Sequence, residues 1–272
     1  MGIPVVCDDH ARLEMERLSQ RGRFTVTSTS HRGARWGRGR LQSAVSAVIL
    51  LVAAFPVQAR QQKTGFRIDN RVAQQEVAVF FNNVLLTSYC YYDSVMKPFL
   101  YPINTPDGIT VTRGFPLNPV AGERTDHPHH TGLWMNYESV NGLDFWNNST
   151  SIPIANRHHY GTIRHSRILE TYNKKKKAFI KASARWLDAD GNVLLNEITG
   201  YSFSIVDTVL VIDRITTLSA AGKEVVFKDV KDGFLGLRVA RELELPSQQA
   251  DHFVDAQGNI TTVAAVNKEG VS

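Results

Sequence analysis

Apolar and polar residues alternate with a period of two along most of the chain from Phe66 onward, and β-branched and aromatic residues are frequent there. In residues 178–187 small and apolar residues occupy every even position, whereas Lys181, Ser183 and Arg185 lie between them. A strand with this pattern buries one face and turns the other toward water. The pattern therefore predicts half-buried β-strands rather than helices.

Short turns separate the alternating segments, and together they predict an all-β fold, a β-sandwich of two packed antiparallel sheets. Residues 97–103 are expected at a sheet edge, because Pro98 and Pro102 each remove a backbone N–H donor. A helical pattern is found at residues 11–18, in the N-terminal extension. The predicted strands are 75–81, 84–92, 97–103, 162–172, 178–187, 193–205, 209–218, 224–228 and 234–240.

Residues 113–162 have no sustained period and contain four prolines and five glycines. A connection of this length is usually functional or disordered, and the aromatic residues in it argue against disorder. We therefore expect a long functional loop that is held by the sandwich.

The first 59 residues have the pattern of a leader. Arg35, Arg38 and Arg40 precede a 12-residue apolar run, residues 44–55, and small residues follow at Val57 and Ala59. This pattern predicts a signal peptide over about 34–59 with cleavage near Ala59, and a periplasmic or secreted protein. An uncleaved anchor is the alternative, although the run is shorter than the roughly 20 residues of a membrane span. Residues 60–272 are then a single β-sandwich domain.

The formal net charge of +5 comes from this leader. Residues 1–59 hold eight of the 31 basic and four of the 26 acidic residues, which leaves 23 basic and 22 acidic residues in the rest. The chain after residue 59 is therefore close to neutral, which argues against a nucleic-acid partner. No membrane partner is expected after cleavage. Cys90 is the sole cysteine after residue 59, so an internal disulfide is excluded there, and its aromatic neighbours predict a buried thiol.

The strongest concentration of chemical groups is Asp126-His127-Pro128-His129-His130. In an extended segment His127 and His129 would project to one side and His130 to the other. Three interpretations stay open. His127 and His129 could hold a divalent metal ion as two of its ligands; the histidines could act as general acid or base, oriented by Asp126 or Asp144; or they could hold the loop in shape. Candidates for a third metal ligand are Glu123, Asp126, His158, His159 and His165.

Aromatic and basic residues surround this segment. Trp134 and Trp146 could stack on a sugar ring, and the alternative is that they pack under the loop as core. Arg113 and Arg124 could bind oxygen-rich groups bidentately, and the alternative is a surface ion pair.

Several motifs resemble those of the bacterial PmoA family, which carries the label "methane oxygenase". The resemblance covers about residues 66–242. It implies an exported protein with a β-sandwich suggestive of galactose-mutarotase-like folds, and it supports a sugar-related role by association. Members of that family continue further, so the domain is expected to be incomplete at its C-terminus. The matching motifs are Tyr101-Pro102, Thr112-Arg113-Gly114, 126–130, Gly132-Leu133-Trp134, 141–146 and 233–240.

These observations favour an exported carbohydrate-active protein that acts on a sugar or glycoside as a lyase, hydrolase or epimerase. The alternatives are a sugar-binding or cell-envelope module without catalysis, and a copper- or iron-dependent oxygenase. The expected catalytic residues are Asp126, His127, His129, His130 and Asp144; the expected substrate-binding residues are Arg113, Arg124, Trp134 and Trp146.

Overall fold

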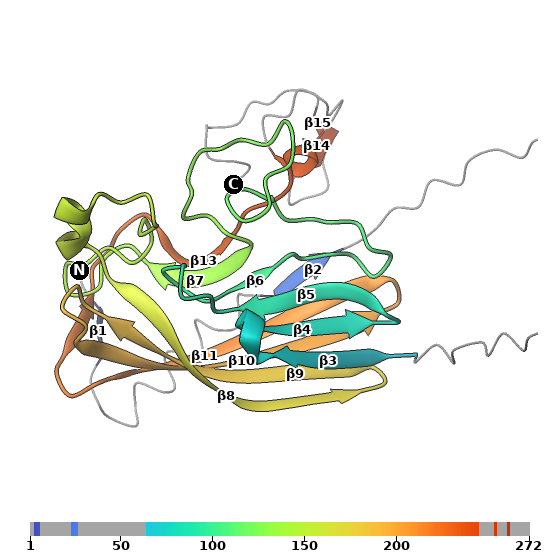
Figure 1. Cartoon of the computed structure of the whole chain (residues 1–272), viewed down its shortest axis with the longest axis horizontal. Helices are drawn as coiled ribbons and strands as arrows, with labels where there is room; N and C mark the ends of the chain where they lie inside the picture. Colours follow the sequence, from blue (N-terminus) through green and yellow to red (C-terminus); the bar gives the residue numbers. More distant parts are fainter. Residues whose placement is uncertain (1–2, 6–22, 27–63, 245–252, 255–259, 262–272) are drawn as a thin grey trace, which may run out of the picture.

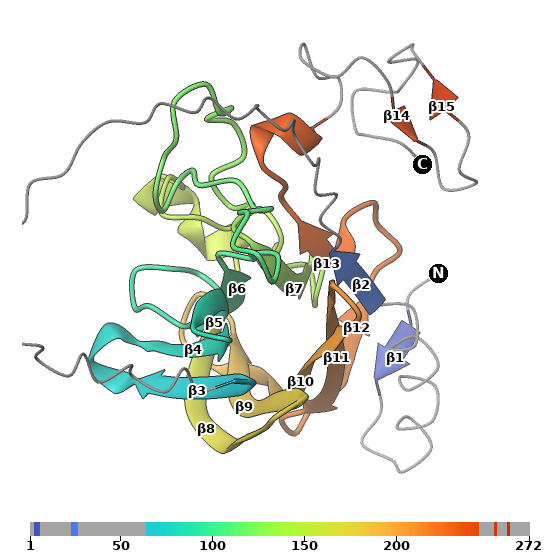
Figure 2. The ribbon, with the colours of Figure 1, turned by 90° about the vertical axis from the view of Figure 1, so that its right-hand side faces the viewer.

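The computed structural model describes residues 3–5, 23–26, 64–244, 253–254 and 260–261 of the 272-residue chain. Two antiparallel sheets face each other as curved layers (Figure 1 and Figure 2). One sheet has six strands in the order β13-β7-β6-β5-β4-β3, and the other has five in the order β2-β11-β10-β9-β8. The prediction of an all-β, two-sheet antiparallel sandwich is confirmed.

The six-stranded sheet consists of β3 (Phe66–Arg71), β4 (Glu76–Phe81), β5 (Val84–Cys90), β6 (Phe99–Tyr101), β7 (Leu133–Tyr137) and β13 (Gly233–Leu237). The five-stranded sheet consists of β2 (Arg23–Val26), β8 (Thr162–Lys174), β9 (Lys177–Leu187), β10 (Val193–Val206) and β11 (Val209–Ala220). Two small pairs are β1 (Ile3–Val5) with β12 (Val225–Phe227), and β14 (Phe253–Val254) with β15 (Ile260–Thr261). The 3-10 helices are η1 (Val72–Gln74), η2 (Ile154–His159) and η3 (Arg241–Leu243). Among the described residues no helix has the length and apolar character needed to cross a membrane.

The predicted meander is present as β8 to β11, and each strand agrees with its predicted bounds within two residues. In β9 the even positions from Ala178 to Trp186 are buried, whereas Lys181, Ser183 and Arg185 remain half-buried or exposed. Asp188 closes the turn between β9 and β10, because its carboxylate accepts hydrogen bonds from the backbone N–H groups of Asp190 and Asn192. Side-chain periodicity therefore predicted the four strands and the buried face of β9.

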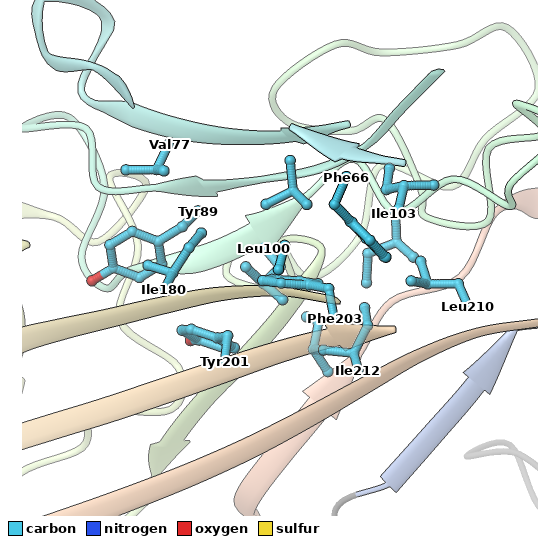
Figure 3. Close-up of a cluster of buried hydrophobic side chains, with 14 of the residues drawn as sticks. Phe66, Val77, Tyr89, Leu100, Ile103, Ile180, Tyr201, Phe203, Leu210 and Ile212 are labelled. Atoms are coloured by element: carbon cyan, nitrogen blue, oxygen red, sulfur yellow. The ribbon is translucent and has the colours of Figure 1, made fainter. Parts of the chain in front are cut away.

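The main core lies between the two sheets (Figure 3). Leu86, Leu100 and Leu133 of the six-stranded sheet are buried in the same cluster as Ile180 and Phe203 of the five-stranded sheet. Each such side chain contributes about 1.5–3 kcal/mol relative to an exposed one. This burial holds the two layers together.

The six-stranded sheet is buried on its outer face as well. Phe99 and Trp134, the sequence neighbours of inward-facing Leu100 and Leu133, belong to a separate buried cluster with Cys90 and Trp146. Successive side chains of a strand point to opposite faces, so this second cluster lies outside the sandwich. The connection 113–132 lies on that side (Figure 1 and Figure 2). The connection 138–161 contributes Trp146 to the outer cluster and also reaches the five-stranded sheet, because the Phe145 ring lies 4.9 Å from that of Trp186 on β9.

Two predictions about this sheet were wrong. β6 is not at an edge, since it pairs with both β5 and β7; Pro98 and Pro102 lie just outside the three-residue strand and do not interrupt either ladder. Residues 113–162 are not one irregular loop, because they contain β7. β7 has no alternating pattern because neighbouring Leu133 and Trp134 are both buried, on opposite faces.

The predicted signal peptide at 34–59 lies outside the described residues. Within the extension, β1 and β2 pair with β12 and β11 respectively. Cys90 is buried as a free thiol, and burial raises its pKa to about 12, so it is protonated and unsuited to nucleophilic chemistry at neutral pH.

Candidate functional site

The segment Asp126–His130 forms a tight turn on the outer side of the six-stranded sheet. The His130 N–H donates to the His127 carbonyl at 3.0 Å, with Pro128 at the position of a β-turn that proline favours. His127 has φ +46°. The segment is therefore not extended, and His130 does not point away from the other two histidines as predicted.

The turn packs the three imidazole rings against one another. The centroid of His130 lies 4.9 Å from that of His127, with the rings nearly parallel, and 4.3 Å from that of His129, with the rings perpendicular. Beneath them, His130 stacks on Trp134 with a centroid separation of 4.9 Å, and Trp134 contacts Trp146 at 5.3 Å. The histidines thus form the upper layer of an aromatic stack.

Arg113 holds this turn from inside. Its side chain has no exposed surface, and its two terminal nitrogens donate to four backbone carbonyls, those of residues 124, 126, 127 and 130. Nη1 also contacts Asp126 Oδ1 at 2.9 Å. A loop carbonyl without a partner is costly to bury, and one guanidinium satisfies four of them. Arg113 is therefore engaged by the loop itself and does not present its guanidinium to an oxygen-rich ligand, contrary to expectation.

Asp126 is the electrostatic centre of the turn. Its Oδ1 lies 2.9 Å from both Arg113 Nη1 and Arg238 Nη2, and its Oδ2 lies 2.9 Å from His127 Nδ1. Partial burial raises the pKa of Asp126, but the hydrogen bond with His127 and the positive charge of Arg238 lower it more, and the net shift is downward. Asp126 is therefore a carboxylate at neutral pH.

His129 and His130 are held in the neutral form. Burial is the main cause, and neighbouring positive charge adds to it; the pKa of His129 is lowered to about 3 and that of His130 to about 2. The Nε2 atoms of both rings, together with Trp134 Nε1, are buried without a hydrogen-bond partner in the described part of the chain. These two histidines are poor proton carriers near neutral pH, whereas His127, with 53% of its side chain exposed, faces solvent.

Sequence reasoning missed Lys97. Its side chain is buried, and its ammonium donates to the His129 carbonyl at 2.7 Å and lies 5.4 Å from the Trp134 ring centroid. Burial lowers its pKa to about 7, although the charge of Asp144 acts in the opposite direction. No local pattern around Lys97 indicated its burial, because its partners come from β7 and from the turn, 32 or more residues away.

Arg238 and Glu244 were also missed. Arg238 Nη2 lies 2.9 Å from Glu244 Oε1, and Glu244 Oε2 lies 3.4 Å from both Arg124 Nε and Arg241 Nη1. Glu244 is buried, and the positive charges of these arginines offset the cost of removing its carboxylate from water. Arg124, predicted to bind substrate, is 39% exposed and forms an ion pair at the rim of this network.

Asp144 does not join the histidines. Its carboxylate accepts hydrogen bonds from the backbone N–H and the side-chain amide of Asn147, which folds the following loop. Its negative charge raises the pKa of Lys97. A direct orienting contact from Asp144 to a histidine is therefore not present, and Asp126 has that position.

Trp134 and Trp146 are only 2% and 8% exposed. A platform for a sugar ring needs an open aromatic face, and His130 covers Trp134. The two tryptophans are therefore the floor of the site, as the alternative interpretation held, and not its stacking surface.

Of the five candidates for a third metal ligand, Asp126 lies beside His127 and the other four are engaged elsewhere. Glu123 accepts hydrogen bonds from the backbone N–H groups of Gly114 and Phe115, and His165 stacks on Tyr91 at 4.0 Å. The rings of His158 and His159 in η2 contact each other in a tilted arrangement, with a centroid separation of 3.8 Å. Within the described ranges no three His, Cys, Asp or Glu side chains are grouped so that they could hold a metal ion.

The fold and this site together define a β-sandwich protein whose outer sheet face carries a histidine-rich turn, held by a buried arginine. The chain belongs to a family of unknown function, DUF6807, whose model matches residues 76–271. The match runs from β4 onward and includes the turn, β7 and β13. No curated protein and no solved structure matches the chain.

Proposed function

We propose that this is an exported enzyme that uses the Asp126–His127 pair for general acid–base chemistry on a sugar or glycoside. The observation that carries the proposal is the 2.9 Å contact between Asp126 Oδ2 and the Nδ1 of a half-exposed imidazole. A carboxylate can only accept, so Nδ1 carries the proton and donates. In the neutral ring the other nitrogen, Nε2, is then the base.

Arg113 and Arg238 support the same assignment. Both guanidiniums contact Asp126 Oδ1, so the carboxylate is fixed in position and kept ionised. A fixed carboxylate holds the imidazole in one tautomer and stabilises the imidazolium that forms after proton uptake. His129 and His130, which are neutral and buried, pack against His127 and support its ring.

The sugar part of the proposal is supported by the resemblance of the motifs around this turn to those of the PmoA family. The half-exposed guanidinium of Arg124, which is joined to Asp126 through Glu244 and Arg238, is suited to oxygen-rich groups. The tryptophans contribute no stacking face, so substrate recognition falls to polar groups at the rim. We therefore expect a site that is open and polar.

The test is a turnover screen of the secreted protein against oligosaccharides and glycosides, followed by His127→Ala and Asp126→Asn. General base catalysis supplies about 10²–10⁴-fold, so each variant should lower kcat by at least about 100-fold. His158→Ala is the matched control, because this exposed histidine lies in η2 and contacts His159 rather than the turn.

Three outcomes would count against the proposal. Full turnover by His127→Ala removes the base. Saturable sugar binding with no turnover of any substrate favours the binding-module alternative. Loss of turnover on dialysis against a chelator, restored by a divalent metal, favours the metal-dependent alternatives.

A further inference from the structure

A cavity opens where the β5–β6 connection meets β8. Its volume is about 150 Å³. This is room for about five water molecules at liquid density, which suits a single sugar unit better than a drug-sized ligand. The lining residues are Gln75, Tyr91, Tyr92, Asp93, Val95, Lys97, Pro98, Ile163, Arg164 and His165.

Hydrogen bonds between the two sheets fix the walls of the cavity. Arg164 Nη1 on β8 donates to the carbonyls of Asp93 and Val95 in the β5–β6 connection, at 3.0 and 2.6 Å. His165 stacks on Tyr91, and its Nδ1 lies 3.2 Å from Tyr89 Oη. The cavity is therefore a formed feature that needs little rearrangement on binding.

The rim combines donors and acceptors. Gln75 Nε2 donates to Asp93 Oδ2 at 2.8 Å, and the Asp93 N–H donates to Gln75 Oε1 at 2.9 Å, so the carboxylate is oriented while its other oxygen can accept. The contacts of the Arg164 side chain described above come from Nη1, and a guanidinium has further N–H groups to donate. A hydroxyl both donates and accepts, so a ring carrying several hydroxyls matches this mixture.

The remaining wall is apolar and aromatic, with Tyr91, Tyr92 and Ile163. The C–H groups of a sugar ring suit such a wall, as they do other amphipathic aromatic surfaces. Asp93 disfavours an anionic ligand at the same rim, and the Lys97 ammonium is directed to the His129 carbonyl. We propose that this cavity binds one neutral sugar unit, held by Asp93 and Arg164 and packed against Tyr91.

This site is distinct from the Asp126–His127 pair, and its proposal does not depend on catalysis there. Lys97 lines the cavity and also donates to the turn that carries His127, so the two sites are one lysine side chain apart.

The experiment measures binding without turnover, in the His127→Ala background. Methyl glycosides of glucose, galactose, mannose and xylose are titrated by calorimetry, with glucuronate as the anionic comparison. At least one neutral glycoside should bind, and Asp93→Ala should weaken its Kd by about tenfold or more, since a hydrogen bond to a charged group is lost. Tyr91→Ala should weaken the same Kd. Arg167→Ala, exposed on the same strand β8, is the matched control and should leave the Kd unchanged.

Asp93 is exposed, so its variant is expected to fold, and thermal unfolding checks this. The proposal is overturned if none of the neutral glycosides binds, if both cavity variants bind as tightly as the parent, or if glucuronate binds at least tenfold more tightly than every neutral glycoside. Because turnover is not measured, failure of the acid–base proposal leaves this result intact, and the reverse also holds.

Discussion

Lys97 should make the folded protein more stable as the pH rises above 7. Its pKa is about 7 in the folded state, against 10.5 for an ordinary lysine, because burial removes the ammonium from water. Between these two values the unfolded chain keeps a proton that the folded chain has released. Stability therefore increases with pH wherever the unfolded state binds more protons. Below pH 7 both states are protonated, and the cost of the buried charge is fully present.

The size of the effect follows from one proton. The free energy of unfolding should increase by about 1.4 kcal/mol per pH unit within the window, and by about 2–3 kcal/mol between pH 7.5 and 9.5. Lys97→Met keeps a flexible apolar stem and removes the titrating group. It also loses the 2.7 Å hydrogen bond to the His129 carbonyl, which lowers stability by a similar amount at every pH.

The assay is urea unfolding of the parent and of Lys97→Met at pH 7.5, 8.5 and 9.5. Other groups titrate in this range in both proteins, so the informative quantity is the difference between the two curves. That difference should change by about 2–3 kcal/mol across the window, in favour of the parent at high pH. Parallel curves would refute the reasoning, because they would show that Lys97 titrates alike in the folded and unfolded chains.

Other variants test the remaining contacts. Arg113→Met should lower the free energy of unfolding by at least about 3 kcal/mol in urea, because loop carbonyls and a carboxylate lose a buried partner, whereas the half-exposed Arg124→Met should cost less than about 1 kcal/mol; equal effects would contradict the assignment. Burial lowers the pKa of His165 to about 4, so between pH 6.5 and 4 the unfolded chain takes up a proton that the folded chain does not. The free energy of unfolding therefore falls as the pH falls through this range. The melting temperature of His165→Phe, which lacks the titrating group, should fall less than that of the parent between pH 6.5 and 4.5. Gly236→Ala should cost about 1–3 kcal/mol and alter tryptophan fluorescence, since the added Cβ would overlap the buried ring of Trp134; unchanged fluorescence would argue against that contact.

The Asp126–Arg238–Glu244 contacts connect the turn to the chain that follows β13. Arg238 bridges the two carboxylates, at 2.9 Å to each. The site is therefore assembled from three distant parts of the sequence: the β5–β6 connection with Lys97, the turn at 126–130, and the segment 238–244. A change in the segment 238–244 is expected to reach His127 through Asp126, whereas a change at Lys97 would act on the turn through the His129 carbonyl.

The sequence alone determined the scaffold. Residues 162–218 form strands joined by short turns, so the strands, the turns between them and the buried side of β9 could be predicted from neighbouring residues. The position of the candidate site could be predicted too, since Asp126–His130 is a local concentration of ionisable groups. Each of these features is encoded by residues close together in the chain.

Tertiary structure decided the rest. β6 and β7 are buried on both faces because the long connections cover the outer side of the sheet, and no local alternation reports that second layer. Trp134 lies beneath the site and offers no binding surface, because His130 covers it. Arg113 supports the turn from inside, because four backbone carbonyls accept hydrogen bonds from it. Long-range packing places Asp126, and not Asp144, against His127. It also buries Lys97 beneath the turn, 32 residues away from His129 in the sequence. The sequence pattern contains neither contact.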